Sequence, residues 1–60
     1  MYQVYRAVRG SKFWVPLLRD PVRDQEAKEV ARVLARSRPE WQFAIGRDDR
    51  RKVRMEFVAQ

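Results

Sequence analysis

The chain has no cysteine and no histidine, and it has only two glycines. Without a thiolate or an imidazole it lacks the usual ligands of a structural zinc ion and the usual base of an acyl-transfer site. No disulfide can reinforce the fold, and a domain of 60 residues buries only about 60% of the surface that its unfolded chain exposes. We therefore expect one small domain, residues 1–60, that depends on side-chain packing, with or without a second chain.

Catalytic patterns are also missing. Two glycines cannot supply a glycine-rich phosphate loop. Asp48 and Asp49 are neighbouring carboxylates, but Arg50, Arg51 and Lys52 follow them directly. That surrounding indicates charge balance in a turn rather than an acid–base pair. We expect a protein that is not an enzyme and that holds no metal and no cofactor.

Long hydrophobic runs are absent as well. The longest uncharged apolar stretch covers residues 13–18, whereas a helix needs about 20 residues to cross a bilayer. The first ten residues lack the charged and apolar regions of a secretory signal. We therefore expect a cytoplasmic protein with no membrane partner.

Positive charge is what the sequence has in excess. The chain has 14 Lys and Arg against 8 Asp and Glu, a net charge of +6 and a pI near 10.8. Eleven of the 14 basic residues are arginine, whose planar guanidinium binds carboxylates and phosphates through paired hydrogen bonds; codon usage in a GC-rich genome is an alternative explanation of that ratio. The charge predicts an acidic surface of a protein complex, or nucleic acid, as the partner.

Residues 2–8 and 12–18 alternate in polarity and predict a β-hairpin that turns at Gly10-Ser11. The two-residue turn would place Arg6 opposite Val15 and Tyr5 opposite Pro16. Arg6 is then the misfit on an otherwise apolar face, where it would lie at an edge and extend its charge to water. The predicted apolar face consists of Val4, Val8, Phe13, Val15 and Leu17.

The middle of the chain predicts a helix. It begins either with Asp20 as N-cap and Pro21 as the first helical residue, or with Asp24 as N-cap and Pro21 in the loop. Asp24 is expected to pair with Lys28, and Pro39 ends the helix. The apolar residues that recur at helical spacing are Ala27, Val30, Ala31, Leu34 and Ala35.

Residues 41–45 and 52–59 also alternate and predict a second hairpin. Their apolar sets share one face only if Ile45 lies opposite Val53 and Phe43 opposite Met55. A loop of three or five residues within 47–51 meets this condition. A two-residue loop at Asp48-Asp49 does not, because it would put Ile45 opposite Lys52.

The order β-β-α-β-β predicts an α+β fold of two layers, with one helix on a four-stranded, mostly antiparallel sheet. The strand order stays open, and a strand edge could pair with a second copy to give a homodimer. The sheet face away from the helix is expected to be open. On it would lie Tyr5, Trp14, Gln42, Ala44, Lys52, Arg54 and Glu56.

Two surfaces are candidate binding sites. The tip of the second hairpin, "RDDRRKVR", has a local excess of three positive charges from Arg47, Arg50, Arg51, Lys52 and Arg54, and could contact phosphates or an acidic groove. A solvated turn kept soluble by charge is the alternative. The open sheet face would set the aromatic rings of Tyr5 and Trp14 beside Arg9, Lys12, Lys52 and Arg54, as in single-strand binders. Rings that cover the back of the sheet or form a dimer contact are the alternative there.

The stretches "FWVPLL", "EAKEVA" and "PEWQFAI" follow one another between residues 13 and 45. In this order the chain resembles the small early RNA polymerase inhibitors of podophages, a β-β-α-β family with an aromatic-to-Val-Pro second strand and a Glu- and Ala-rich helix. The resemblance covers about residues 8–47. That family uses arginines on the strand after the helix, where this chain has Gln42, Ala44 and only Arg47 as a near match, and this chain adds a fourth strand.

The resemblance implies a phage protein that binds a host enzyme in the host cytoplasm without doing chemistry. Together with the charge, it predicts a non-enzymatic binding module that docks on a host nucleic-acid-handling complex and inhibits it. Direct binding of single-stranded nucleic acid through the sheet face, and self-association as a structural component, are the alternative functions.

Overall fold

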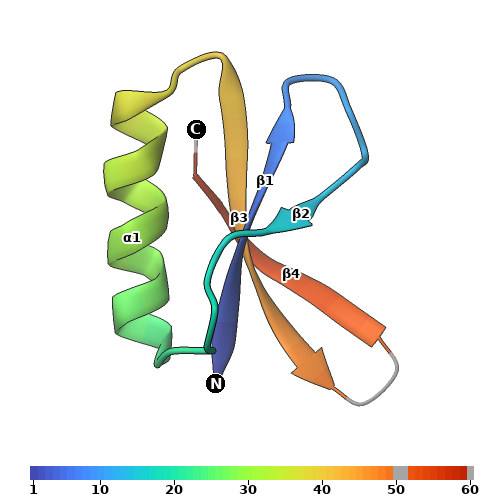
Figure 1. Ribbon diagram of the computed structural model, residues 1–60, viewed down its shortest axis with the longest axis vertical. Helices are drawn as coiled ribbons and strands as arrows, with labels where there is room; N and C mark the ends of the chain where they lie inside the picture. The colour runs from blue at the N-terminus through green and yellow to red at the C-terminus, as the bar shows by residue number, and fades with distance from the viewer. Residues whose placement is uncertain (50–51, 60) are drawn as a thin grey trace.

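The computed structural model describes the backbone of residues 1–49 and 52–59, and the side chains of residues 1–47. Its elements are β1 (Tyr2–Val8), β2 (Val15–Pro16), α1 (Asp24–Ser37), β3 (Trp41–Asp49) and β4 (Lys52–Ala59). Figure 1 shows α1 lying along one side of the sheet. One helix packed on an antiparallel sheet is the α+β class that the sequence predicts.

The sheet has the order β2-β1-β3-β4, and every neighbouring pair in it is antiparallel. Strands β1, β3 and β4 have seven, nine and eight residues and form the body of the sheet. Strand β2 has only two residues, so the strand predicted over residues 12–18 is mostly absent. The long central pair joins β1 to β3, which are distant in the sequence.

The first hairpin has the predicted register and a different turn. Tyr5 lies opposite Pro16 and Arg6 opposite Val15, as expected. The Ser11 amide donates to the Val8 carbonyl at 2.9 Å, so Arg9 and Gly10 are the central residues of the turn rather than Gly10 and Ser11. Gly10 has φ of 85°, a value that residues with a Cβ rarely adopt. Residues 11–14 then form a loop instead of continuing the ladder.

Beyond β2 the chain stays alongside β1 through other contacts. The Leu17 amide donates to the Val4 carbonyl at 2.8 Å. The Gln3 side-chain amide donates to the Leu18 carbonyl at 2.8 Å, and its oxygen accepts the Leu18 amide at 2.7 Å. A bridge between Tyr2 and Val22 completes the alignment. The Gln3 side chain thus replaces the backbone hydrogen bonds of the ladder where the pairing of β1 with β2 stops.

The helix begins at Asp24, with Arg23 as N-cap and no side-chain hydrogen bond there. Pro21 lies in the preceding loop, so the predicted cap at Asp20 is wrong, and Asp24 is the first helical residue rather than the cap. Asp24 pairs with Lys28 at 3.3 Å, as predicted. The helix ends at Ser37, just before Arg38 and Pro39, because a residue that precedes proline disfavours helical geometry.

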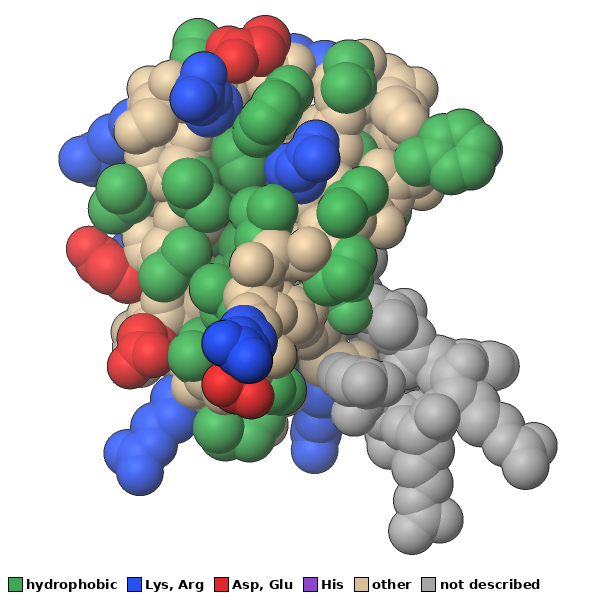
Figure 2. Space-filling model, in the orientation of Figure 1, with side chains coloured by type: hydrophobic (Ala, Val, Ile, Leu, Met, Phe, Trp, Pro, Cys, Tyr) green, Lys and Arg blue, Asp and Glu red, His purple; other side chains and the backbone are tan. Residues whose placement is uncertain are grey.

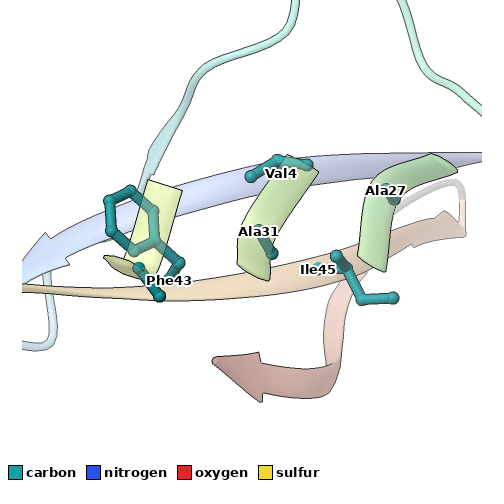
Figure 3. Packing of buried hydrophobic residues seen from close by; sticks show 6 residues of the cluster. Val4, Ala27, Ala31, Phe43 and Ile45 are labelled. Carbon is teal, nitrogen blue, oxygen red and sulfur yellow. The ribbon is translucent and has the colours of Figure 1, made fainter. Parts of the chain in front are cut away.

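The core lies between α1 and the β1–β3 pair. Alanines at Ala27, Ala31 and Ala35 form the buried face of α1, and their small side chains let the helix come close to the sheet. The sheet contributes Val4, Phe43 and Ile45, each fully buried (Figure 3). The helical spacing therefore identified the buried helix face correctly.

The second hairpin does not have the predicted register: Val53 lies opposite Asp48 and Met55 opposite Gly46. Strand β3 extends to Asp49, which lies opposite Lys52. Ile45 lies opposite Phe57 instead of Val53. With this short connection and no irregularity, Ile45 would lie opposite Glu56. A bulge between Ile45 and Gly46 shifts the register by one residue and restores an apolar partner. The sequence argument left out such a bulge.

Four of the five residues predicted on the apolar face are exposed. Val4 is buried, but Val8, Phe13, Val15 and Leu17 are not. An α-helix with its side chains is about 10–12 Å across and strands are about 4.8 Å apart, so one helix covers about two to three strands. Because α1 lies over the strands from β1 to β4, β2 at the edge receives no cover from it. Phe13 lies in the loop that replaces the predicted strand.

The sheet face away from the helix is not open at its centre. The prediction of an open face is therefore wrong there. Tyr5 is 9% exposed, and Ala7 and Ala44 are buried too. Gln42 lies on this face because its neighbour Phe43 packs against the helix. The Gln42 side-chain amide donates to the Ser11 carbonyl at 2.9 Å and holds the 9–14 loop to this face.

Replacing Ala31 with leucine should destabilise the protein, because three added carbons must enter the space between α1 and the sheet. We expect the free energy of unfolding to fall by about 1–3 kcal/mol. Urea denaturation followed by circular dichroism measures it. Val33→Leu, at an exposed position of the same helix, is the control and should change stability by less than about 0.5 kcal/mol. Equal effects of the two changes would contradict the close packing described here.

Pro16 blocks the free edge of the sheet. Because the Leu17 amide points to β1, the alternation of the strand turns the nitrogen of residue 16 outward, and proline has no N–H there. Pro16→Thr should therefore add an outward donor and increase self-association with concentration, measured by sedimentation velocity. Val15→Thr, whose amide faces β1, is the control. The explanation fails if both variants sediment alike.

Candidate functional site

The predicted hairpin tip is described in part. Arg47 is exposed near the end of β3, and the β3–β4 register sets it opposite Arg54, with Asp49 opposite Lys52. Arg50 and Arg51 lie outside the described residues, as do the side chains of Lys52 and Arg54. What the structure supports is therefore one exposed arginine on a hairpin rich in basic residue types.

The predicted aromatic platform on the sheet face is not formed by exposed rings. Tyr5 is buried and Trp14 is half-buried. Arg9 and Lys12 are exposed, but Arg9 turns its Nε to the Pro39 carbonyl at 2.9 Å, toward the loop that joins α1 to β3. The structure thus separates Arg9 from the surface for which it was predicted.

A different cluster forms around Trp41. The guanidinium carbon of Arg6 lies 4.6 Å from the centroid of the indole ring, and that of Arg38 lies 5.7 Å from it. Both distances are within the range of cation–π attraction. Phe43 packs at the same ring with a centroid separation of 6.3 Å and a tilt of 58°. Trp41 therefore packs against the core residue Phe43, and its ring contacts two guanidinium groups.

Arg9 completes this arginine–tryptophan cluster, defined here as Arg6, Arg9, Arg38 and Trp41. The Arg9 amide donates to the Glu40 carbonyl at 3.5 Å. Glu40 immediately precedes Trp41 in the sequence, so Arg9 lies close to Trp41 in space. Within residues 1–47, none of the three arginines forms an ion pair with a carboxylate. Three guanidinium groups that pair with no carboxylate of the described side chains therefore gather at the C-terminal end of α1.

Sequence reasoning missed this cluster. It placed Trp41 in the core and treated Arg6 as a misfit that escapes to water. The register explains the contact: Arg6 lies opposite Phe43, and Trp41 opposite Val8, so Arg6 and Trp41 share the helix-facing side of the sheet. A charged residue on an apolar face, next to an aromatic position of the neighbouring strand, was the available signal. It could not be used while the strand order was unknown.

An apolar strip adjoins the cluster on the same side of the sheet. It consists of Val8, Val15 and Leu17, which are 56%, 42% and 37% exposed. Arg6 lies directly opposite Val15, so its backbone position adjoins the strip, while its guanidinium lies over Trp41 on the other neighbouring strand. Figure 2 shows hydrophobic side chains across the face between α1 and β2, with Lys and Arg side chains among them. Phe13, at 86% exposed, projects from the nearby loop.

Comparison of the chain with protein-family models, with curated proteins and with solved structures found no match. In the part of the chain that the structure describes, no three His, Cys, Asp or Glu residues come together as metal ligands. Nor does that part contain a helix long and apolar enough to cross a bilayer. The case for function therefore comes from the surface residues themselves.

Removing the stacked cation tests the cluster. Arg6→Gln should lower the free energy of unfolding by about 0.5–2 kcal/mol, the range of a cation–π contact, and should make Trp41 more accessible to acrylamide. Quenching is read in a Trp14→Phe background, so that Trp41 is the one fluorophore of its kind.

Arg19→Gln, at an exposed arginine in the loop before α1, is the control for the loss of one charge. If the two variants lose the same stability and show the same quenching, Arg6 contributes charge alone and the stacking has no effect.

Proposed function

We propose that this protein is a non-enzymatic binding module that docks on an acidic surface of a protein complex. The observation that carries the proposal is the exposure of aliphatic side chains beside guanidinium groups that no described carboxylate neutralises. Apolar contact area supplies affinity, and complementary charge supplies association rate and specificity. A surface with both features fits a protein partner.

The finer proposal is that the module inhibits a host nucleic-acid-handling complex and is encoded by a phage. Its support is the resemblance of residues 8–47 to the podophage RNA polymerase inhibitors, together with the net charge of +6. Complexes that handle nucleic acid have partners of negative charge, and a small basic protein is attracted to the acidic surfaces near them. Arg47 and the basic residues of the β3–β4 hairpin add to that attraction.

Nucleic acid itself is less well suited to the described surface. Single-strand binders stack bases on exposed aromatic rings, whereas Tyr5 is buried and Trp41 already carries two guanidinium groups. The aliphatic side chains of Val8, Val15 and Leu17 offer no stacking surface to a base. We therefore propose a protein as the partner of this surface, with nucleic acid as the second candidate.

A tagged pull-down from bacterial lysate tests the proposal, with and without nuclease and at low and high salt. We expect a discrete protein that stays bound after nuclease treatment. Arg47→Glu should reduce its capture more than Arg23→Glu, which changes the net charge equally at an exposed residue beside the start of α1.

The opposite result is also distinct. Nucleic acid that co-purifies, leaves at high salt and takes every bound protein with it would replace this proposal with direct nucleic-acid binding. In that case Trp14→Ala should weaken binding by about 1–3 kcal/mol if a base stacks on that ring.

A further inference from the structure

The guanidinium groups of Arg6 and Arg38 keep their hydrogen-bond donors available. Their guanidinium carbons lie 4.6 and 5.7 Å from the centroid of the Trp41 ring. Within residues 1–47 neither guanidinium donates a hydrogen bond to another protein group, and each group has five N–H donors. Contact with the indole also restricts these long side chains, so that a ligand has less conformational entropy to remove.

The position of Arg6 favours a carboxylate ligand. Arg6 is half-buried between Val15 and Phe43, its partners on the two neighbouring strands. Charges attract more strongly in a partly dehydrated environment than in open water. Arg38 and Arg9 are exposed nearby and add positive charge at the same end of the fold.

The apolar strip supplies the second half of the surface. Val15 lies opposite Arg6, Leu17 lies two residues along the same strand direction, and Val8 lies two residues from Arg6 on β1. Alternate residues of a strand share a face, so these side chains lie on the same face of the sheet as Arg6. A ligand that fits must therefore bring carboxylates and aliphatic side chains close together.

Two other occupants fit less well. A second copy related by a two-fold axis would bring its own arginine cluster against this one, since both subunits of such an interface use the same patch. Pairing of two β2 edges is also blocked by Pro16. A nucleic acid offers phosphates for the arginines but nothing that covers Val8, Val15 and Leu17.

We propose that the arginine–tryptophan cluster and the apolar strip form one docking surface for an acidic, aliphatic segment of a partner protein. Carboxylates of that segment accept hydrogen bonds from Arg6 and Arg38, and its aliphatic side chains cover Val8, Val15 and Leu17. This inference rests on the proposed function, and names the surface and the chemistry of the partner.

The test uses a short synthetic peptide composed of aspartate, glutamate and leucine, titrated into the Trp14→Phe protein while Trp41 emission is recorded. Arg6→Gln and Arg38→Gln should each weaken binding about tenfold, which corresponds to about 1.4 kcal/mol. Val15→Ser should weaken it as well, because the apolar contact is lost. Arg23→Gln, the matched control at the other end of α1, should change binding less than about twofold.

Peptide composition separates charge from apolar contact. A peptide with serine in place of leucine should bind more weakly, and a peptide with glutamine in place of the acids should not bind. Circular dichroism of each variant confirms that it is folded, so a loss of binding is assigned to the surface.

Several outcomes would overturn the inference. Equal weakening by Arg6→Gln and Arg23→Gln would mean that net charge alone attracts the peptide. Tighter binding of an oligothymidylate than of the peptide, with the same dependence on Arg6, would make this a nucleic-acid surface. Sedimentation that shows self-association abolished by Arg6→Gln would make it an interface between copies.

Failure of this inference is distinguishable from failure of the proposed function. If the Arg6→Gln and Arg38→Gln proteins still capture the nuclease-resistant partner in full, the docking function stands and this surface is wrong. If the wild-type protein captures no protein from lysate but binds the peptide in an Arg6-dependent way, the surface stands and the proposed function is wrong.

Discussion

The width of one helix sets the character of this protein. Helix α1 covers β1, β3 and β4, and the sheet extends one strand further, to β2. The residues under the helix, Val4, Phe43 and Ile45, are fully buried, while Val15 and Leu17 at the β2 edge stay exposed. Among residues 1–49 and 52–59 no second helix is present to cover them. Because one helix forms the whole layer over the sheet, the core is small and an apolar strip stays exposed at the surface.

The charged residues follow from this arrangement. Arg6 occupies a position that a wider helical layer would bury, and an unpaired charge there would be costly. The ring of Trp41 gives the Arg6 guanidinium a favourable contact, with the guanidinium carbon 4.6 Å from the ring centroid. Ala27, Ala31 and Ala35 keep the helix close to β1 and β3, so the edge of the covered region falls near Arg6. Packing and binding surface are thus two results of one geometry.

Local patterns predicted what depends on local structure. The alanine spacing identified the helix and its buried face, Pro39 marked its end, and alternation with a tight turn gave the pairing of Arg6 with Val15. The errors, and the strand order that stayed open, concern features without a local signal. The bulge beside Gly46, the loop at residues 11–14 and the strand order depend on how distant segments fit together. Because the arginine–tryptophan cluster joins β1 to β3 and to the end of α1, the sequence could name its residues but not bring them together.

The strand order also governs how the chain folds during synthesis. Strand β1 is made first, yet its principal partner is β3, and the hairpin with β2 supplies only two paired residues before then. Val4 and Tyr5 are therefore buried only after β3 has paired with β1. Contacts between segments so far apart slow folding, since a long loop must close before any of them forms. The core between β1 and β3 therefore cannot be completed before β3 has been synthesised.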